Sequence, residues 1–195
     1  MNLPNKLTVA RFILTVVFVI LFYVPLQNRV GLALLVFIAA ALTDLADGKI
    51  ARARGLVTNF GKLMDPLADK VLMTAALVFL AVAELHPIPA WIVVAVLARE
   101  FFVTGIRVVA ANNGVILAAE KLGKHKMVWQ VITTIYFLML QASLEPNTRW
   151  LDAMFAWKPM SPGIFGVFCL VMMTGLTMIS GFSYFWKNRK LFGDA

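Results

Sequence analysis

Six long apolar stretches, separated by prolines, glycines and asparagines, dominate this sequence. Each is close to the roughly 20 residues that an α-helix needs to cross a bilayer. Hydrophobic residues make up 61% of the 195 residues and charged residues only 14%, so a water-soluble domain of this composition would expose large apolar patches. We therefore predict an all-α integral membrane protein, with residues 1–195 forming one domain of six transmembrane helices. The predicted spans are 7–26, 30–53, 61–84, 88–110, 118–142 and 161–186.

The positions of the basic residues predict the orientation of these spans. With the N-terminus inside, only Arg29, Arg149 and Lys158 of the 18 lysines and arginines fall on the outer side. Basic residues gather on the cytoplasmic side of membrane proteins, so both termini are expected there. The net charge of +8 favours contact with anionic lipid headgroups or phosphorylated substrates, and we expect no nucleic-acid partner. The single cysteine, Cys169, excludes a disulfide framework.

Four aspartates stand out against this apolar background. Asp44 and Asp47 are three residues apart, and Asp65 and Asp69 are four apart, so each pair shares one face of a helix. A short turn around residues 55–59 would make the second and third spans an antiparallel hairpin, with Asp47 opposite Asp65 and Asp44 opposite Asp69. Carboxylates at membrane depth are costly and indicate a functional site.

Three kinds of partner would compensate these carboxylates. Lysine or arginine pairing is available nearby, and protonation would suit a proton-coupled transporter. Divalent cations suit the cluster best, because Mg²⁺ and Mn²⁺ prefer hard oxygen ligands, often together with substrate phosphates. Two such ions would stabilise both the attacking and the leaving oxygen of a phosphoryl displacement.

The aspartates belong to a longer pattern that resembles the signature of the CDP-alcohol phosphotransferase family at every defined position. The pattern is Asp44-x-x-Asp47-Gly48-x-x-Ala51-Arg52, eight further residues, then Gly61-x-x-x-Asp65-x-x-x-Asp69. The resemblance implies a six-helix membrane fold that binds two divalent cations, Mg²⁺ or Mn²⁺. It also implies that all four aspartates are metal ligands and that Asp69 is in addition the general base.

The resemblance assigns a donor site as well. It implies that Gly48, Ala51 and Arg52, together with Gly61, line the site for the CDP-linked lipid. The N-terminal segment Pro4-Asn5-x-Leu7-Thr8-x-x-Arg11 is similar to the family's opening helix, which implies that Asn5, Thr8 and Arg11 also contact the donor. Homodimerisation is a further expectation from the family.

Basic residues near the cytoplasmic ends of the fourth and fifth spans predict an acceptor site. The predicted basic cluster consists of Arg99, Arg107, Lys121, Lys124 and Lys126. A phosphorylated acceptor needs such a cluster, because phosphate is recognised by arginine forks and lysine point charges. The segments around these residues resemble family members whose acceptor is sn-glycerol 3-phosphate. In the simpler alternative, Arg99 and Arg107 anchor the orientation, with Glu100 as the partner of Arg107.

These observations predict an enzyme of the bacterial inner membrane with its active site facing the cytoplasm. It would transfer the phosphatidyl group of CDP-diacylglycerol to sn-glycerol 3-phosphate, giving phosphatidylglycerophosphate and CMP. One alternative is the same chemistry with another acceptor, such as an inositol phosphate. An alternative of another class is an ion- or proton-coupled membrane transporter. Residues 143–160 receive no function from the sequence.

Overall fold

The structure, a computed structural model, describes residues 3–54, 59–115, 117 and 121–189. For residues 3, 4, 44–54, 59–63, 65, 66, 69 and 121 it describes the backbone alone. Among the described residues, six helices have between 21 and 26 residues. They are α1 (Leu3–Tyr23), α2 (Arg29–Arg54), α3 (Asn59–Val82), α4 (Ala90–Asn112), α5 (Lys121–Ala142) and α7 (Val167–Asn188). Five of them begin and end within four residues of a predicted span, whereas α7 begins six residues after the start of its span, and the described part of the chain contains no strand.

Two of the described helical segments, Asn5–Tyr23 and Pro162–Asn188, are long and apolar enough to cross a membrane. The bent pair Leu122–Ala142 and Pro146–Ala156, with an angle of 119° between its parts, would supply a third. The apolar parts of α2 and α3 are shorter, Arg29–Thr43 and Lys70–Val82, because the aspartate motif occupies the remaining turns of these helices. The chain is therefore all-helical over the described residues, with two to three candidate membrane spans.

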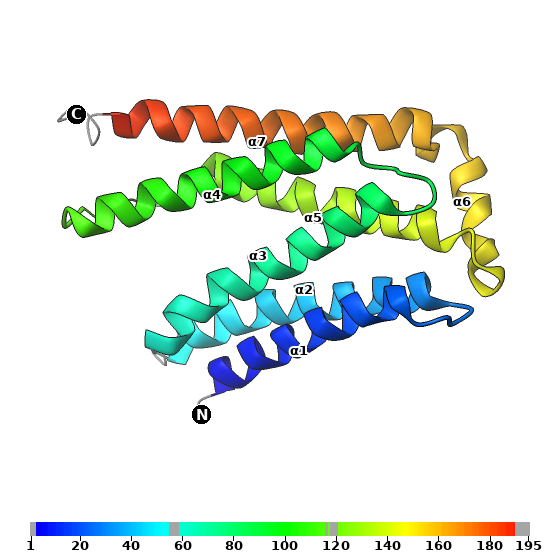
Figure 1. Cartoon of the computed structure of the whole chain (residues 1–195), viewed down its shortest axis with the longest axis horizontal. Helices are drawn as coiled ribbons and strands as arrows, with labels where there is room; N and C mark the ends of the chain where they lie inside the picture. Colours follow the sequence, from blue (N-terminus) through cyan, green and yellow to red (C-terminus); the bar gives the residue numbers. More distant parts are fainter. Residues whose placement is uncertain (1–2, 55–58, 116, 118–120, 190–195) are drawn as a thin grey trace.

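The long helices lie side by side and run back and forth along one bundle (Figure 1). Helix α1 packs against α2 and α3, while α7 packs against α4 and α5. The start of α1, the end of α2, the start of α3 and the end of α7 all lie at one end of the bundle, called here the open end (Figure 1). The two helices that carry the aspartate motif therefore meet at this end.

Short helices cross the opposite end of the bundle, called here the α6 end (Figure 1). They are η1 (Pro146–Leu151), α6 (Asp152–Ala156), η2 (Lys158–Met160) and η3 (Pro162–Gly166). The ring of Tyr136 on α5 contacts Phe155 and Phe165 at centroid distances of 5.5 and 5.1 Å, and its hydroxyl donates a hydrogen bond to the Met160 carbonyl at 2.8 Å. These contacts fix the short helices against α5.

A single carboxylate joins the same segment to α2. The two oxygens of Glu145 accept hydrogen bonds from the backbone N–H groups of Val30 and Gly31, at 2.8 and 2.9 Å. These amides lie in the first turn of α2, where N–H groups have no partner within the helix and the helix dipole favours a negative charge. A methyl group at Gly31 would lie 3.3 Å from a side-chain carbon of Thr148, so the two segments are closely packed.

Candidate active site

The predicted donor residues of α1, together with Thr15, form a buried polar stripe. Asn5, Thr8, Arg11 and Thr15 follow each other at helical spacing and are all buried, Arg11 with 0% of its surface exposed. The helix that carries them packs against α2 and α3. Burial of an arginine is costly unless it is paired, and Asn5, Thr8 and Arg11 each interact with another residue. The structure thus turns the polar face of α1 towards the inside of the bundle.

The four predicted metal ligands occupy two consecutive helices, as the hairpin prediction requires. Positions 44 and 47 lie in α2, and positions 65 and 69 lie in α3. The side chains of several predicted site residues lie outside the described residues; they are Asp44, Asp47, Asp65, Asp69, Gly48, Ala51, Arg52, Gly61 and Lys121. Among the side chains that the structure describes, no three of His, Cys, Asp and Glu gather as a metal site. Four carboxylates at helical spacing are a hard-oxygen donor set that fits Mg²⁺ or Mn²⁺.

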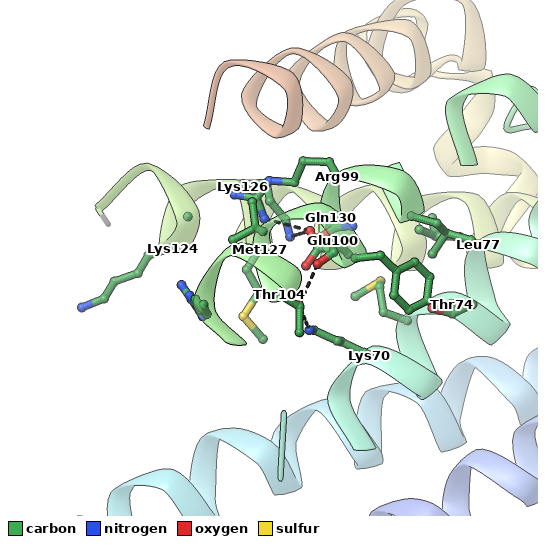
Figure 2. Close-up of a pocket in the computed structure, with 16 residues that line it drawn as sticks. Lys70, Thr74, Leu77, Arg99, Glu100, Thr104, Lys124, Lys126, Met127 and Gln130 are labelled. Atoms are coloured by element: carbon green, nitrogen blue, oxygen red, sulfur yellow. Dashed lines mark hydrogen bonds and ion pairs between the residues drawn. The ribbon is translucent and has the colours of Figure 1, made fainter. Parts of the chain in front are cut away.

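A cavity of about 310 Å³, called here the polar cavity because several charged side chains line it, lies between α3, α4 and α5 (Figure 2). Its lining includes four of the five residues of the predicted basic cluster, namely Arg99, Arg107, Lys124 and Lys126. Lys70, Glu100 and Thr104 line it as well. Five basic side chains against one acidic side chain give the lining a formal charge of +4. Such a cavity is suited to a small anion, because arginine and lysine are the usual phosphate partners.

Glu100 organises the deep part of this cavity. Its Oε1 accepts a hydrogen bond from Arg99 Nη1 at 3.0 Å and another from Lys126 Nζ on α5 (Figure 2). All three side chains are largely shielded, with 20%, 11% and 7% of the Glu100, Arg99 and Lys126 side chains exposed. The carboxylate thus neutralises part of the charge of the two deepest cations.

The expectation that Glu100 pairs with Arg107 is wrong. Arg107 Nε donates a hydrogen bond to the hydroxyl of Tyr184 on α7 at 3.1 Å, and its guanidinium carbon lies 5.4 Å from the centre of the Tyr184 ring. The expectation relied on spacing within one helix, whereas Arg107 pairs with a residue of α7, and Glu100 pairs with its neighbour Arg99 and with Lys126 of α5. Sequence separation within α4 carried no information about those helices.

Lys70 lines the cavity as well, although it was not among the predicted site residues. Its Nζ donates a hydrogen bond to Thr104 Oγ1 on α4 (Figure 2), and the Thr104 hydroxyl donates to the Glu100 carbonyl at 2.7 Å. The position of Lys70 in the sequence could have indicated this role. Because Lys70 directly follows Asp69, it is rotated by about 100° around α3, so it faces a neighbouring helix rather than the face of the aspartates.

The outer part of the cavity carries more accessible cations. Lys124 is exposed and points away from the Glu100 group (Figure 2), and Arg107 is also exposed. The basic cluster therefore has two layers. Arg99 and Lys126 are deep and share one carboxylate, while Arg107 and Lys124 lie nearer to solvent.

A second, apolar cavity of about 260 Å³ lies next to the polar one. Met73 on α3 and Met127 on α5 line both cavities. The second cavity is otherwise lined by apolar residues of α2, α3 and α5, with Arg11 of α1 as its only charged lining residue among those described. A polar and an apolar compartment thus meet at α3 and α5.

Comparison with known proteins identifies this arrangement. The sequence profile of CDP-alcohol phosphatidyltransferases matches residues 1–160. The chain belongs to this family. The resemblance indicated by the aspartate pattern is therefore confirmed. The match ends before α7, although α7 contributes the partner of Arg107.

Several relatives carry a more specific name, and the bacterial ones are similar to this chain in length. The CDP-diacylglycerol–glycerol-3-phosphate 3-phosphatidyltransferase of Bacillus subtilis (strain 168) is 38% identical, over 96% of this chain and 95% of that protein. A protein of the same name from Rickettsia bellii (strain RML369-C) is 35% identical, over 98% and 97%. A chloroplastic/mitochondrial enzyme of this kind from Arabidopsis thaliana is 36% identical, over 78% of this chain and 55% of the plant protein. The similarity to the bacterial proteins thus extends over nearly the whole chain.

Proposed function

We propose that this protein transfers the phosphatidyl group of CDP-diacylglycerol to sn-glycerol 3-phosphate, giving phosphatidylglycerophosphate and CMP. The observation that carries the proposal is the cationic cavity beside α3, the helix that contains positions 65 and 69. An acceptor that brings its own phosphate needs cations next to the reacting centre. The bacterial relatives over 95% or more of their length are named for this reaction.

The donor is proposed to lie against α1, α2 and α3. Asn5, Thr8 and Arg11, whose side chains are buried in the bundle, would bind it together with Gly48, Ala51, Arg52 and Gly61 of the motif. The apolar cavity next to Arg11 would receive part of the lipid, because burial of an acyl chain is favourable. Asp44, Asp47, Asp65 and Asp69 would hold two Mg²⁺ or Mn²⁺ ions, which when bound neutralise the donor diphosphate.

The acceptor is proposed to enter the polar cavity. Arg107, Lys124 and Lys121 would bind its phosphate first, and Arg99 and Lys126 would complete the site at depth. Asp69 would take the proton of the acceptor hydroxyl, whose oxygen then attacks the phosphorus that carries the lipid. The bond from that phosphorus to the CMP oxygen breaks, and CMP leaves with the electron pair. Positioning of the two substrates would supply much of the rate enhancement.

Helical spacing supports this placement of the base. Position 69 lies four residues before Met73 on α3, so the two positions are one turn apart on the same face. Met73 lines both the polar and the apolar cavity. A base at position 69 would therefore stand next to the boundary between the proposed acceptor and donor compartments.

The proposal includes six membrane spans with both termini and the active site on the cytoplasmic side of a bacterial inner membrane. Six long helices alternate in direction, and α1 begins at the same end at which α7 ends (Figure 1). Most basic residues are expected at that end, which favours its cytoplasmic location. A homodimer in the bilayer is part of the proposal.

A second acceptor is possible within the same chemistry. The cations of the polar cavity recognise phosphate, whichever polyol carries it, so an inositol phosphate is the alternative acceptor. Membership of a transferase family and the names of the relatives favour group transfer over the transporter alternative.

The test is CMP release by the purified protein in detergent, from CDP-diacylglycerol with Mg²⁺, with and without sn-glycerol 3-phosphate. Release that requires both the acceptor and the metal supports the proposal. Release only with inositol phosphate would reassign the acceptor. Folded protein that releases no CMP with any phosphorylated or free alcohol, but moves ions or substrate across proteoliposomes, would refute it in favour of transport.

A further inference from the structure

We propose that α7 positions the two arginines of the acceptor site. Gly181 and Ser180 would fix Arg99, and Tyr184 would fix Arg107, so that this face of α7 sets the affinity for the acceptor phosphate. The inference rests on the proposed function, and it concerns a helix that lies beyond the residues matched by the family profile, 1–160.

The side chain of Arg99 lies directly on the backbone of α7. A methyl group at Gly181 would lie 2.8 Å from Arg99 Cγ, which is closer than carbon atoms approach each other, so any larger residue would displace the arginine stem. Gly181 is itself buried. Glycine at this position therefore allows Arg99 to pass between α4 and α7.

Ser180 fixes the end of the same side chain. Arg99 Nη2 donates a hydrogen bond to Ser180 Oγ at 2.9 Å, and the Ser180 hydroxyl donates to the Thr177 carbonyl at 3.0 Å. The serine proton is thus engaged within α7, which leaves the oxygen lone pairs for the arginine. With Nη1 bound to Glu100 at 3.0 Å, the guanidinium is held from two sides.

Tyr184 performs the same task for Arg107, one turn further along α7. Its hydroxyl accepts the hydrogen bond from Arg107 Nε at 3.1 Å, and its ring lies under the guanidinium. The tyrosine is 3% exposed and packs with Val103 and Ile106 of α4. A rigid, buried ring therefore orients an exposed arginine at the mouth of the cavity.

Such support matters because arginine has a long stem with many rotamers. Immobilising such a side chain on binding costs enough to weaken affinity by roughly 2- to 12-fold. Where the protein already holds the side chain in place, the substrate does not have to pay this cost. Both arginines line the proposed acceptor cavity, so the effect of α7 should appear in acceptor affinity rather than in donor affinity.

The test compares two glycine-to-alanine variants of the same helix. Gly181→Ala places a methyl group against Arg99, whereas at Gly175 on α7 a methyl group would meet nothing within 4 Å. In the CMP-release assay, Gly181→Ala should raise the KM for sn-glycerol 3-phosphate about tenfold, while the KM for CDP-diacylglycerol and kcat change less than about twofold. Gly175→Ala should match the unmodified protein.

A second, more conservative variant keeps the inference testable if Gly181→Ala fails to fold. Tyr184→Phe removes only the hydroxyl that holds Arg107 and should raise the same KM about threefold. The inference is overturned if both variants leave the KM for sn-glycerol 3-phosphate unchanged. It is also overturned if they raise the KM of the donor in parallel, because that would show a general loss of structure.

A failure of the proposed function can be distinguished from a failure of this inference. If the unmodified protein released no CMP with sn-glycerol 3-phosphate, the inference would be tested by the rise in melting temperature that inorganic phosphate causes. A smaller rise in Gly181→Ala than in the unmodified protein and in Gly175→Ala would support α7 as the positioning helix while the proposed reaction fails. An equal rise in all three proteins, or none in any, would refute the positioning role.

Discussion

Two glutamates, one at the α6 end and one inside the bundle, show how the same side chain serves different purposes. At the α6 end, Glu145 accepts hydrogen bonds from two backbone amides of α2. At the cavity, Glu100 accepts them from the side chains of Arg99 and Lys126. Backbone amides of a helix are fixed in place, so Glu145 holds two segments together. Side-chain cations can exchange one anion for another, so the contacts of Glu100 are compatible with the phosphate that we propose for this cavity.

Equal substitutions at the α6 end and near the cavity should therefore have unequal consequences. The largest difference is expected for Asp69→Asn, which removes the proposed general base but keeps the size of the side chain. CMP release should fall at least about 100-fold, because a positioned general base contributes a factor of that order, while CDP-diacylglycerol still binds. Asp152→Asn, at an exposed position at the start of α6, is the matched control and should be fully active.

Two outcomes would contradict this prediction. Unchanged turnover in Asp69→Asn would exclude this residue as the base. Equal loss in Asp69→Asn and Asp152→Asn would show that activity depends on the fold as a whole rather than on the open end.

The next largest difference in activity is expected between substitutions of two lysines, Lys124 and Lys158. Lys124 lines the polar cavity and is exposed, so Lys124→Ala should raise the KM for sn-glycerol 3-phosphate about 10- to 100-fold, the loss expected for one hydrogen bond to a charged group. Lys158→Ala removes an equal charge at the α6 end and should have no effect. If Lys124→Ala instead weakened only CDP-diacylglycerol, the assignment of the cavity to the acceptor would be wrong.

Glu145→Gln tests whether Glu145 stabilises the fold without taking part in substrate binding. The amide keeps one acceptor oxygen but loses the charge and one of the two bonds to the first turn of α2. We expect a loss of about 1–2 kcal/mol in the free energy of unfolding, read as a lower melting temperature, with the KM for both substrates unchanged. Glu84→Gln, at an exposed position near the same end, controls for the change of charge. A changed acceptor KM in Glu145→Gln would contradict the division between the two ends.

The candidate site residues could be predicted where the relevant pattern lies within a short stretch of sequence. The aspartate motif has eight defined positions at helical spacing, and the breakers between apolar stretches gave the helix boundaries. A basic cluster on two consecutive spans could also be foreseen, because Arg107, Lys124 and Lys126 lie near the facing ends of α4 and α5, and Arg99 lies about two turns before Arg107 on α4. The structure brings these four residues into one cavity.

Contacts between distant segments were not predictable in this way. Glu100 and Lys126 lie on different helices and are 26 residues apart, and no spacing rule connects them. Glu145 lies 115 residues from Val30. Ser180 and Gly181 resemble ordinary small residues of an apolar helix, and only the packing of α4 on α7 shows that they contact an arginine. Helix packing decides such pairs, and single-helix patterns contain no information on it.

The smallest predicted effect concerns the contact of Lys70 with α4. Thr104→Val keeps the shape of the side chain but removes the hydroxyl that accepts the hydrogen bond from Lys70 and donates to the Glu100 carbonyl. Loss of one such bond should raise the KM for sn-glycerol 3-phosphate about threefold, with little change in melting temperature. Thr74→Val is the control, because Thr74 lines the same cavity and makes no hydrogen bond among the described residues. Equal effects in both variants would mean that the polarity of the cavity, rather than the position of Lys70, controls acceptor binding. Lys70 would then not be one of the cations that bind the acceptor phosphate.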